Sequence, residues 1–273
     1  MKLAVLGSGS GGNAVIVESG GRSLLIDAGF SCRRIEERLG ELGREAGALD
    51  ALLLTHEHQD HVVGADRLVR RHGVPVFATE GTLAAAALSP EATDFFRPIR
   101  SGRPFLVESR DTSEPIFRVE AFRLPHDARE PVGFVVEDAT GRRLGLVADL
   151  GARTQLAWGR LRDLDALIIE TNHDLGMLRQ GPYPWHLKQR VASRHGHLSN
   201  AEAAFGVDEL VSDRLRWVVL YHLSRTNNQP ALAAQAVGET LDRRGSKAQL
   251  VVTQQDAATP WVEIDRGQLA LTF

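Results

Sequence analysis

The chain has a single cysteine, Cys32, among its 273 residues. One cysteine cannot form a disulfide within the chain, and nothing in the sequence indicates an oxidising compartment. Apolar runs long enough to span a membrane are also missing, and Gly and Ser interrupt the short apolar start MKLAVLGSGSGG too early for a secretory signal. We therefore expect a soluble, cytoplasmic protein without a membrane partner.

A strong net charge of either sign is absent as well. The 32 Lys and Arg residues nearly balance the 35 Asp and Glu residues, which leaves a net charge of -3. This balance does not indicate a general nucleic-acid binder, so any such contact would have to come from a local basic patch. Hydrophobic residues at 43% and charged residues at 25% are ordinary for a globular protein of this size.

Strand-like and helix-like patterns alternate along the chain, and no linker divides it. Apolar runs predict strands at residues 2–7, 13–18, 22–29, 48–55, 74–79, 115–126, 131–138, 142–151, 165–171, 216–223 and 248–253. Helical spacing predicts helices at residues 31–43, 61–73, 80–88, 201–213 and 230–242, with Ser31 as an N-cap and Gly73 as a C-terminal stop. The economical interpretation is one domain over residues 1–273, with two β-rich halves and helices outside.

The glycine-rich GSGSGG, residues 7–12, matches G-x-G-x-x-G and follows a predicted strand. A dinucleotide site also needs a helix directly after this motif, but the β-branched NAVIVES predicts a strand. We therefore reject a nucleotide cofactor and interpret the segment as a flexible turn. Its amides could instead approach a substrate phosphate, and Ser8, Ser10 and Asn13 are candidate substrate contacts.

Four metal-ligand side chains lie within THEHQDH, where a predicted strand ends and a helix begins: His56, His58, Asp60 and His61. In an extended segment His56 and His58 point to the same side, so both can bind one ion. Asp60 and His61 lie across the turn, which favours a second, neighbouring ion. The alternative is a solvated polar loop in which Asp60 only caps a helix.

Further candidates follow other predicted strands. His126, Asp149 and His222 would supply the missing imidazoles and a carboxylate able to bridge two cations. Each has a simpler explanation alone: a loop histidine, a turn aspartate and a core histidine. Asp27 also ends a strand, and its carboxylate is suited to hydrogen-bond a metal-ligating side chain on the side away from the metal.

Taken together, these motifs resemble the metallo-β-lactamase superfamily, whose H-x-H-x-D-H signature THEHQDH matches. The resemblance implies an α/β fold of the αββα sandwich type, with two mixed β-sheets flanked by helices and a dinuclear site at one edge. It implies that His56, His58 and His126 hold one metal ion. Asp60, also counted as catalytic, would hold the second ion with His61 and His222, and Asp149 would bridge the two. Aspartate rather than cysteine at position 149 disfavours β-lactam hydrolysis and suits Mn²⁺ alongside Zn²⁺.

Local signatures narrow the resemblance to the YycJ/WalJ group of bacterial 5′-to-3′ DNA exonucleases: GSGSGGN, LPHDAREPVGFVV, IIETNHD, GPYPWHLKQRV, GHLSN and YHLSRTNN. The chemistry implied is in-line attack on a phosphodiester by a hydroxide that bridges two cations. GHLSNAEAA is similar to a stretch of ribonuclease Z whose histidine protonates the leaving oxygen, so His197 is the expected general acid and Glu170 its orienting partner. Alternatively, His197 is only a helix-entry histidine, and His173 in TNHD is a weaker candidate.

A basic stretch, residues 179–194, contains no acidic residue. Its candidate DNA contacts are Tyr183, Lys188 and Arg190, beside Trp185, because cations bind phosphates and aromatic rings stack on bases. Ser224, Arg225 and Asn227 follow His222 and could contact a terminal phosphate. A solvated helix face with structural aromatics is the alternative.

The leading hypothesis is a dinuclear-metal phosphodiesterase, a 5′-to-3′ DNA exonuclease that uses two Zn²⁺ or Mn²⁺ ions. The alternatives are a ribonuclease, a hydrolase of β-lactam or thioester bonds, and a non-enzymatic metal-bearing repair module. Polarity, the native metal and the oligomeric state stay open.

Overall fold

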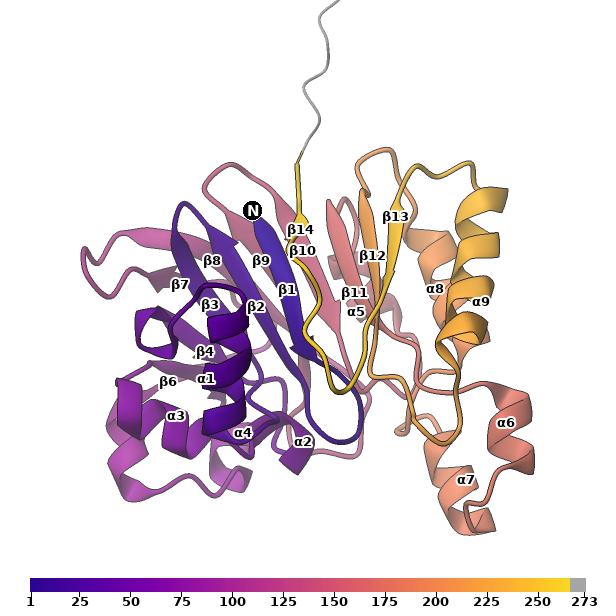
Figure 1. Cartoon of the computed structure of the whole chain (residues 1–273), viewed down its shortest axis with the longest axis horizontal. Helices are drawn as coiled ribbons and strands as arrows, with labels where there is room; N and C mark the ends of the chain where they lie inside the picture. Colours follow the sequence, from indigo (N-terminus) through magenta and orange to yellow (C-terminus); the bar gives the residue numbers. More distant parts are fainter. Residues whose placement is uncertain (266–273) are drawn as a thin grey trace, which may run out of the picture.

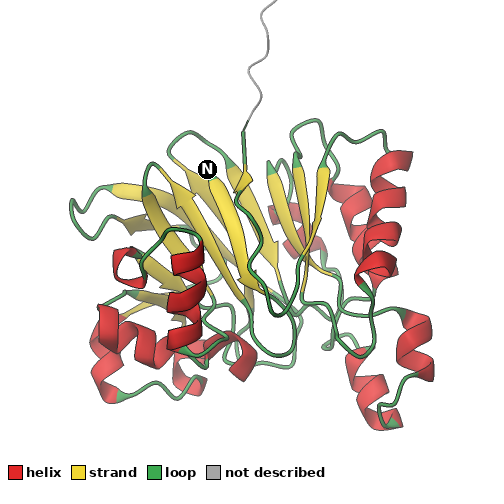
Figure 2. Ribbon diagram, in the orientation of Figure 1, coloured by secondary structure: helices red, strands yellow, loops and turns green. Residues whose placement is uncertain are grey.

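The computed structural model describes residues 1–265 as two stacked β-sheets with helices on both outer faces (Figures 1 and 2). This arrangement confirms the predicted fold class. Within residues 1–265, no helix combines the length and the apolar composition of a membrane span.

The first sheet has the strand order β14-β1-β2-β3-β4-β5-β6. Its strands are β1 (Lys2–Gly7), β2 (Ala14–Ser19), β3 (Arg22–Ile26), β4 (Ala51–Leu53), β5 (Val76–Thr79), β6 (Phe96–Ile99) and β14 (Val262–Glu263). The β14-β1, β1-β2 and β2-β3 pairs are antiparallel, whereas β3 to β6 run parallel.

The second sheet repeats this plan in the order β13-β12-β11-β10-β9-β8-β7. Its strands are β7 (Phe105–Glu108), β8 (Pro115–Arg123), β9 (Val132–Asp138), β10 (Arg143–Val147), β11 (Ala166–Glu170), β12 (Trp217–Tyr221) and β13 (Gln249–Val252). Antiparallel pairing from β7 to β10 changes to parallel pairing from β10 to β13. Because parallel strands end at the same edge, each sheet collects several strand ends on one side.

Three apolar layers hold the sandwich together. Side chains of both sheets meet in the central layer, including Val5 and Phe134. Ile35 and Leu68 belong to the layer that covers the first sheet, and Val207 belongs to the one that covers the second. Each fully buried aliphatic side chain contributes roughly 1.5–3 kcal/mol, so the three layers are the main stabilising term.

The helices divide between the two outer faces. The first half of the chain forms α1 (Cys32–Glu41), η1 (Ala46–Ala48), α2 (Gln59–Val62), α3 (Ala65–His72), α4 (Glu80–Ala85) and η2 (Pro90–Phe95). The second half forms α5 (Gln155–Arg160), α6 (Leu175–Gln180), α7 (Trp185–Val191), α8 (Asn200–Leu210) and α9 (Pro230–Arg243). In Figure 1, α6 and α7 extend below the second sheet, on the same side of the molecule as α2.

Local signals set several helix ends. The Ser31 hydroxyl accepts a hydrogen bond from Arg34 N, and Gly73 adopts φ 64° at the end of α3, so the predicted N-cap and the predicted C-terminal stop are both confirmed. The single helix predicted over residues 61–73 is wrong, because the chain breaks into α2 and α3 at Gly64. A Cβ at Gly64 would lie 2.1 Å from the Phe30 carbonyl oxygen, so glycine permits a close approach of two backbone segments there.

Candidate active site

One edge of the sandwich gathers polar residues from strand ends of both sheets. His56 and His58 follow β4, and Asp60 and His61 lie in α2. The other strand-end residues are Asp27 after β3, His126 after β8, Asp149 after β10, Glu170 at the end of β11 and His222 after β12.

Three of these residues adopt a left-handed backbone conformation. Asp27 has φ 61°, Asp149 has φ 52° and His222 has φ 57°. Each stands within two residues of a strand end, where a left-handed residue turns the chain sharply. Such conformations cost of order 1–3 kcal/mol each for residues other than glycine and concentrate at functional sites. The surrounding fold therefore offsets the conformational free energy that these left-handed residues cost, and it keeps their side chains at the sheet edge.

A first group of possible ligands contains His56, His58 and His126, whose ring nitrogens all lie within 4.8 Å of one another. The His126 Nε2 atom is 3.3 Å from His58 Nδ1, and its Nδ1 lies 3.1 Å from the Gly196 carbonyl oxygen. Because a carbonyl only accepts, Nδ1 carries the proton and Nε2 presents a lone pair. Burial and the nearby His61 lower the pKa of His56 to about 3, so this ring is neutral, as a metal ligand must be.

A second group contains Asp60, His61, Asp149 and His222. The Asp60 Oδ2 atom lies 3.2 Å from His222 Nε2 and 3.7 Å from His61 Nε2. Asp149 Oδ2 lies 2.7 Å from His61 Nε2 and 3.2 Å from His56 Nε2 in the first group. Asp149 thus stands between the two groups.

The candidate metal ligand His61 is supported by Asp27, which lies on the side of the ring away from Asp149 and Asp60. The His61 Nδ1 atom donates to Asp27 Oδ2 at 2.7 Å, and Thr55 N and Oγ1 donate to Asp27 Oδ1 at 2.8 and 3.0 Å. Burial by itself lowers the pKa of His61, but Asp149 and Asp27 outweigh it and raise that pKa to about 10. The hydrogen bond fixes which nitrogen faces the site, as carboxylate partners of metal-bound histidines do.

These residues fit divalent cations. His56 Nε2 and Asp149 Oδ1 are buried polar atoms without a hydrogen-bond partner among the described residues. Burial raises the pKa of Asp149, but His222 and His61 hold it well below its ordinary value, so the carboxylate is ionised. A cation in contact with such atoms would offset the cost of burying them. Imidazole nitrogens and carboxylate oxygens are common ligands of Zn²⁺, and carboxylates also suit Mn²⁺.

A carboxylate–imidazole pair adjoins the second group. His197 Nδ1 donates to Glu170 Oε1 at 2.6 Å and lies 3.2 Å from Asp149 Oδ1. Burial lowers the pKa of His197, but Glu170 and Asp149 outweigh it and raise that pKa to about 10. Burial also raises the pKa of Glu170, yet His197 brings it down to about 2. The pair is therefore ionised, with a protonated imidazole.

A small pocket opens over both groups, with a volume of about 210 Å³. Besides candidate metal ligands and His197, its lining includes residues of the α6–α7 segment and of loops: Tyr183, Leu187, Arg190, Ser10, Ser224 and Asn227. The pocket therefore lies between the sheet edge that carries the candidate metal ligands and the segment formed by α7 and the loop before it.

Four predicted substrate contacts do not line this pocket: Ser8, Asn13, Lys188 and Arg225. Ser8 is only 2% exposed, and its hydroxyl accepts from His222 N at 2.6 Å. Asn13 is fully buried, with Nδ2 at 3.2 Å from both the Asp60 carbonyl oxygen and His61 Nε2. Ser8 and Asn13 therefore support the candidate metal ligands from behind, and their burial argues against the predicted contact with substrate.

The two cationic side chains have other partners. Lys188 Nζ donates to the Arg179 carbonyl oxygen at 2.7 Å, and Arg225 pairs with Asp256 at 2.5 Å. Arg190 lines the pocket but pairs with Asp127 at 2.6 Å. The basic stretch thus has an acidic partner from another part of the chain.

Three backbone amides of the glycine-rich loop are already hydrogen-bonded within the protein. Gly9 N donates to Asn13 Oδ1 at 2.9 Å, Gly11 N to Gln255 Oε1 at 2.7 Å and Gly12 N to Gly9 O at 3.0 Å. These three amides already have acceptors, which argues against their approach to a phosphate. Ser10 lines the pocket and stays a predicted substrate contact.

Two polar residues of the pocket lining, Asp127 and Asn172, were not among the predicted site residues. Asp127 Oδ1 lies 3.3 Å from His126 Nε2, and Asn172 Nδ2 donates to the His222 carbonyl oxygen at 3.1 Å. Their position in the sequence could have indicated them, because Asp127 directly follows the candidate ligand His126 and Asn172 stands two residues after Glu170. The weaker candidate His173 lies outside the pocket lining, 1% exposed and without a hydrogen bond to its ring among the described residues.

Known proteins share this sequence pattern and fold. The family model of the metallo-beta-lactamase superfamily matches residues 7–187. Exodeoxyribonuclease WalJ of Streptococcus pneumoniae is 34% identical over 270 residues, which cover 96% of this chain and 98% of that protein. Exodeoxyribonuclease YycJ of Bacillus anthracis is 32% identical over 246 residues, with 90% of each chain covered. The metallo-beta-lactamase fold protein YhfI of Bacillus subtilis shares the fold, with a TM-score of 0.69 at 16% identity over 94% of this chain and 98% of that one.

Proposed function

The chain belongs to the metallo-β-lactamase superfamily, and on that premise we propose that it is a metal-dependent DNA exonuclease that cuts phosphodiesters from a 5′ end. The observation that carries the proposal is the Glu170–His197 pair, bonded at 2.6 Å beside Asp149. Hydrolysis of a phosphodiester releases an alkoxide that needs a proton, and a protonated imidazole at this position can supply it.

We propose a dinuclear centre. His56, His58 and His126 would hold one divalent ion. Asp60, His61 and His222 would hold the other, with Asp149 between them. When bound, two such ions supply an activated water near neutral pH and neutralise charge on the phosphate.

The protein's own groups account for the remaining steps. Asp27 keeps His61 in a fixed orientation, and Glu170 does the same for His197. Glu170 Oε2 also accepts from Leu150 N at 2.8 Å and from Leu198 N at 3.2 Å, so it cannot swing away. Since Glu170 occupies Nδ1 of His197, the proton for the leaving oxygen comes from Nε2.

The α6–α7 segment supplies the contacts proposed for DNA. Tyr183 and Arg190 line the pocket, and Trp185 is 70% exposed beside them in sequence. Exposed aromatic rings can stack on unpaired bases, and a guanidinium can bind the backbone phosphate. Ser224 and Asn227, on another part of the lining, are proposed to contact a terminal phosphate. Two relatives that cover at least 90% of the chain are named exodeoxyribonucleases, which favours DNA over RNA.

The test combines metal analysis of the purified protein with digestion of end-labelled single- and double-stranded DNA and RNA, in Mn²⁺, Zn²⁺ or Mg²⁺. We expect 5′-labelled DNA to release short products first, and Asp60→Ala to abolish cleavage. Asp94→Ala, at an exposed aspartate outside the pocket, is the matched control. Equal cleavage by Asp60→Ala, or no cleavage of any nucleic acid, refutes the nuclease proposal.

The same samples separate the alternatives. Preferential cleavage of RNA identifies a ribonuclease, and turnover of a lactam or thioester without nucleic-acid cleavage identifies the other hydrolase class. Within that second class the site disfavours thioesters, because a thiolate leaves without the proton that Glu170 keeps on His197.

A further inference from the structure

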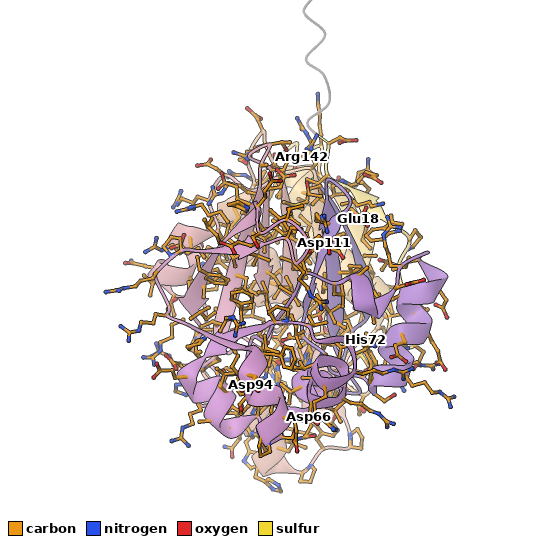
Figure 3. The ribbon with its side chains drawn as sticks, turned by 90° about the vertical axis from the view of Figure 1, so that its left-hand side faces the viewer. Glu18, Asp66, His72, Asp94, Asp111 and Arg142 are labelled. Atoms are coloured by element: carbon orange, nitrogen blue, oxygen red, sulfur yellow. The ribbon has the colours of Figure 1, made fainter. Side chains whose placement is uncertain are left out.

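A second cluster of metal-ligand side chains lies on the outer helical layer of the first sheet. Cys32 and Glu36 are one turn apart on α1, so both side chains project from the same face of the helix. His72 is the last residue of α3 and meets that face. Figure 3, in which His72 is labelled, shows this helical layer toward the viewer. None of the three residues lines the catalytic pocket.

The three ligand atoms converge. Cys32 Sγ, a Glu36 carboxylate oxygen and a His72 ring nitrogen all lie within 4.8 Å of one another. Cys32 Sγ is 3.5 Å from Glu36 Oε1, and that oxygen is 2.7 Å from His72 Nε2. Around a tetrahedral Zn²⁺, ligand atoms lie about 3.3–3.6 Å apart, so the Cys32–Glu36 distance already fits and the Glu36–His72 contact would have to widen, by about 0.6 Å.

The backbone around the cluster is held firmly. Arg110 Nη2 donates to the His72 carbonyl oxygen at 3.0 Å, and Arg110 Nη1 donates to the Gly47 and Leu49 carbonyl oxygens. Cys32 is 3% exposed, whereas the side chains of Glu36 and His72 are 23% and 19% exposed. An ion can therefore reach the cluster from solvent and meet a thiol on its inner side.

We propose that Cys32, Glu36 and His72 form a third metal site, which takes a thiophilic divalent cation such as Zn²⁺ and ties α1 to α3. Thiolate, imidazole and carboxylate together select Zn²⁺ or Co²⁺ over Mn²⁺ and Mg²⁺, which prefer oxygen ligands. Three protein ligands leave a fourth position for water. This site differs from the catalytic groups, none of which contains sulfur.

Two changes accompany binding. Burial and Glu36 raise the pKa of the Cys32 thiol to about 11, so the incoming cation displaces the thiol proton to solvent. Arg71 Nη1 lies 3.3 Å from Glu36 Oε1 and would give up this contact to the cation. With a thiolate and a carboxylate, the ligands neutralise a divalent ion.

The experiment uses Co²⁺ as the probe, because a thiolate bound to Co²⁺ gives a near-ultraviolet charge-transfer band and Cys32 is the chain's single sulfur of that kind. Metal-free full-length protein is titrated to saturation with Co²⁺. We expect the band in the wild type and in Glu41→Gln, a control at an exposed residue of the same helix. Cys32→Ser should lose the band, bind one ion fewer and keep the visible bands of the catalytic ligands.

Saturation of the wild type without a thiolate band overturns the proposal, as does a band that His72→Ala leaves at full strength and unchanged affinity. If Cys32→Ser does not fold, alkylation of the wild-type thiol decides the matter, since Zn²⁺ should slow it. Unchanged alkylation with Zn²⁺ counts against the site. These results do not depend on nuclease activity, so failure of the proposed function is recognised separately.

Discussion

Three donors surround the carboxylate of Glu170: His197 Nδ1, Leu150 N and Leu198 N. Glu170 is fully buried and held by these donors, so it fixes the orientation of the His197 imidazole. Its negative charge raises the pKa of His197 and keeps that ring protonated. The sequence suggested the pair through the resemblance of GHLSNAEAA to a stretch of ribonuclease Z. The backbone donors that hold Glu170 in place come from elsewhere in the fold, and no local pattern predicts them.

At this scale we predict that His197→Ala lowers the rate of DNA cleavage by about 10²–10⁴-fold, the usual contribution of general acid–base catalysis. The loss should be much smaller for a p-nitrophenyl phosphodiester, whose leaving group departs without a proton. Single-turnover rates on both substrates, with metal content measured in parallel, check this expectation. His195→Ala, at the exposed histidine two residues earlier, is the control. Equal losses on both substrates would show that His197 does not act as the acid.

Among the helices of the described residues, α7 is the one without a buried residue. Trp185 at its start is 70% exposed. The Arg190–Asp127 ion pair connects it to the loop beside His126. The sequence predicted a basic stretch here, but not this acidic partner, which lies 63 residues away. A helix with so little burial has a surface available for a ligand.

Arg190→Ala should weaken DNA binding and reduce the slope of log affinity against log salt by about 0.7–0.9, the value for one lost phosphate contact. Equilibrium binding of a labelled oligonucleotide over a range of NaCl concentrations measures this slope. Arg97→Ala, an exposed arginine on β6, should leave the slope unchanged. A wild-type slope in Arg190→Ala would remove α7 from the proposed DNA interface.

At the scale of the whole molecule, the site joins the two sheets. The first sheet supplies His56, His58, Asp60 and His61, and the second supplies His126, Asp149 and His222. Ions held between these groups would bind the folded chain only, because the unfolded chain does not bring the ligands together. Metal binding is therefore expected to stabilise the fold as well as to support catalysis.

We expect that metal removal with a chelator abolishes cleavage and lowers the melting temperature. Mn²⁺ at about 100 times its Kd contributes about 2.7 kcal/mol per site, which corresponds to about 5–10 °C for a chain of this size. Calorimetry of metal-free and Mn²⁺-loaded protein measures the shift, and Asp60→Ala should show less of it. A melting temperature that does not respond to Mn²⁺ contradicts a site shared between the sheets.

The sequence alone determined the layered α/β architecture and the position of ligand-type residues at strand ends. These features follow from local order, because apolar periodicity sets the strands and parallel strands end at one edge. Tertiary structure alone decided which polar side chains face a pocket and which support it. Ser8 and Asn13 have polar side chains of the type that contacts substrates, yet they lie buried behind the candidate metal ligands. Arg190, a candidate phosphate contact, is paired with Asp127. The burial of Ser8 and Asn13 and the pairing of Arg190 depend on residues far away in the sequence, which only the packing of the folded chain brings into contact.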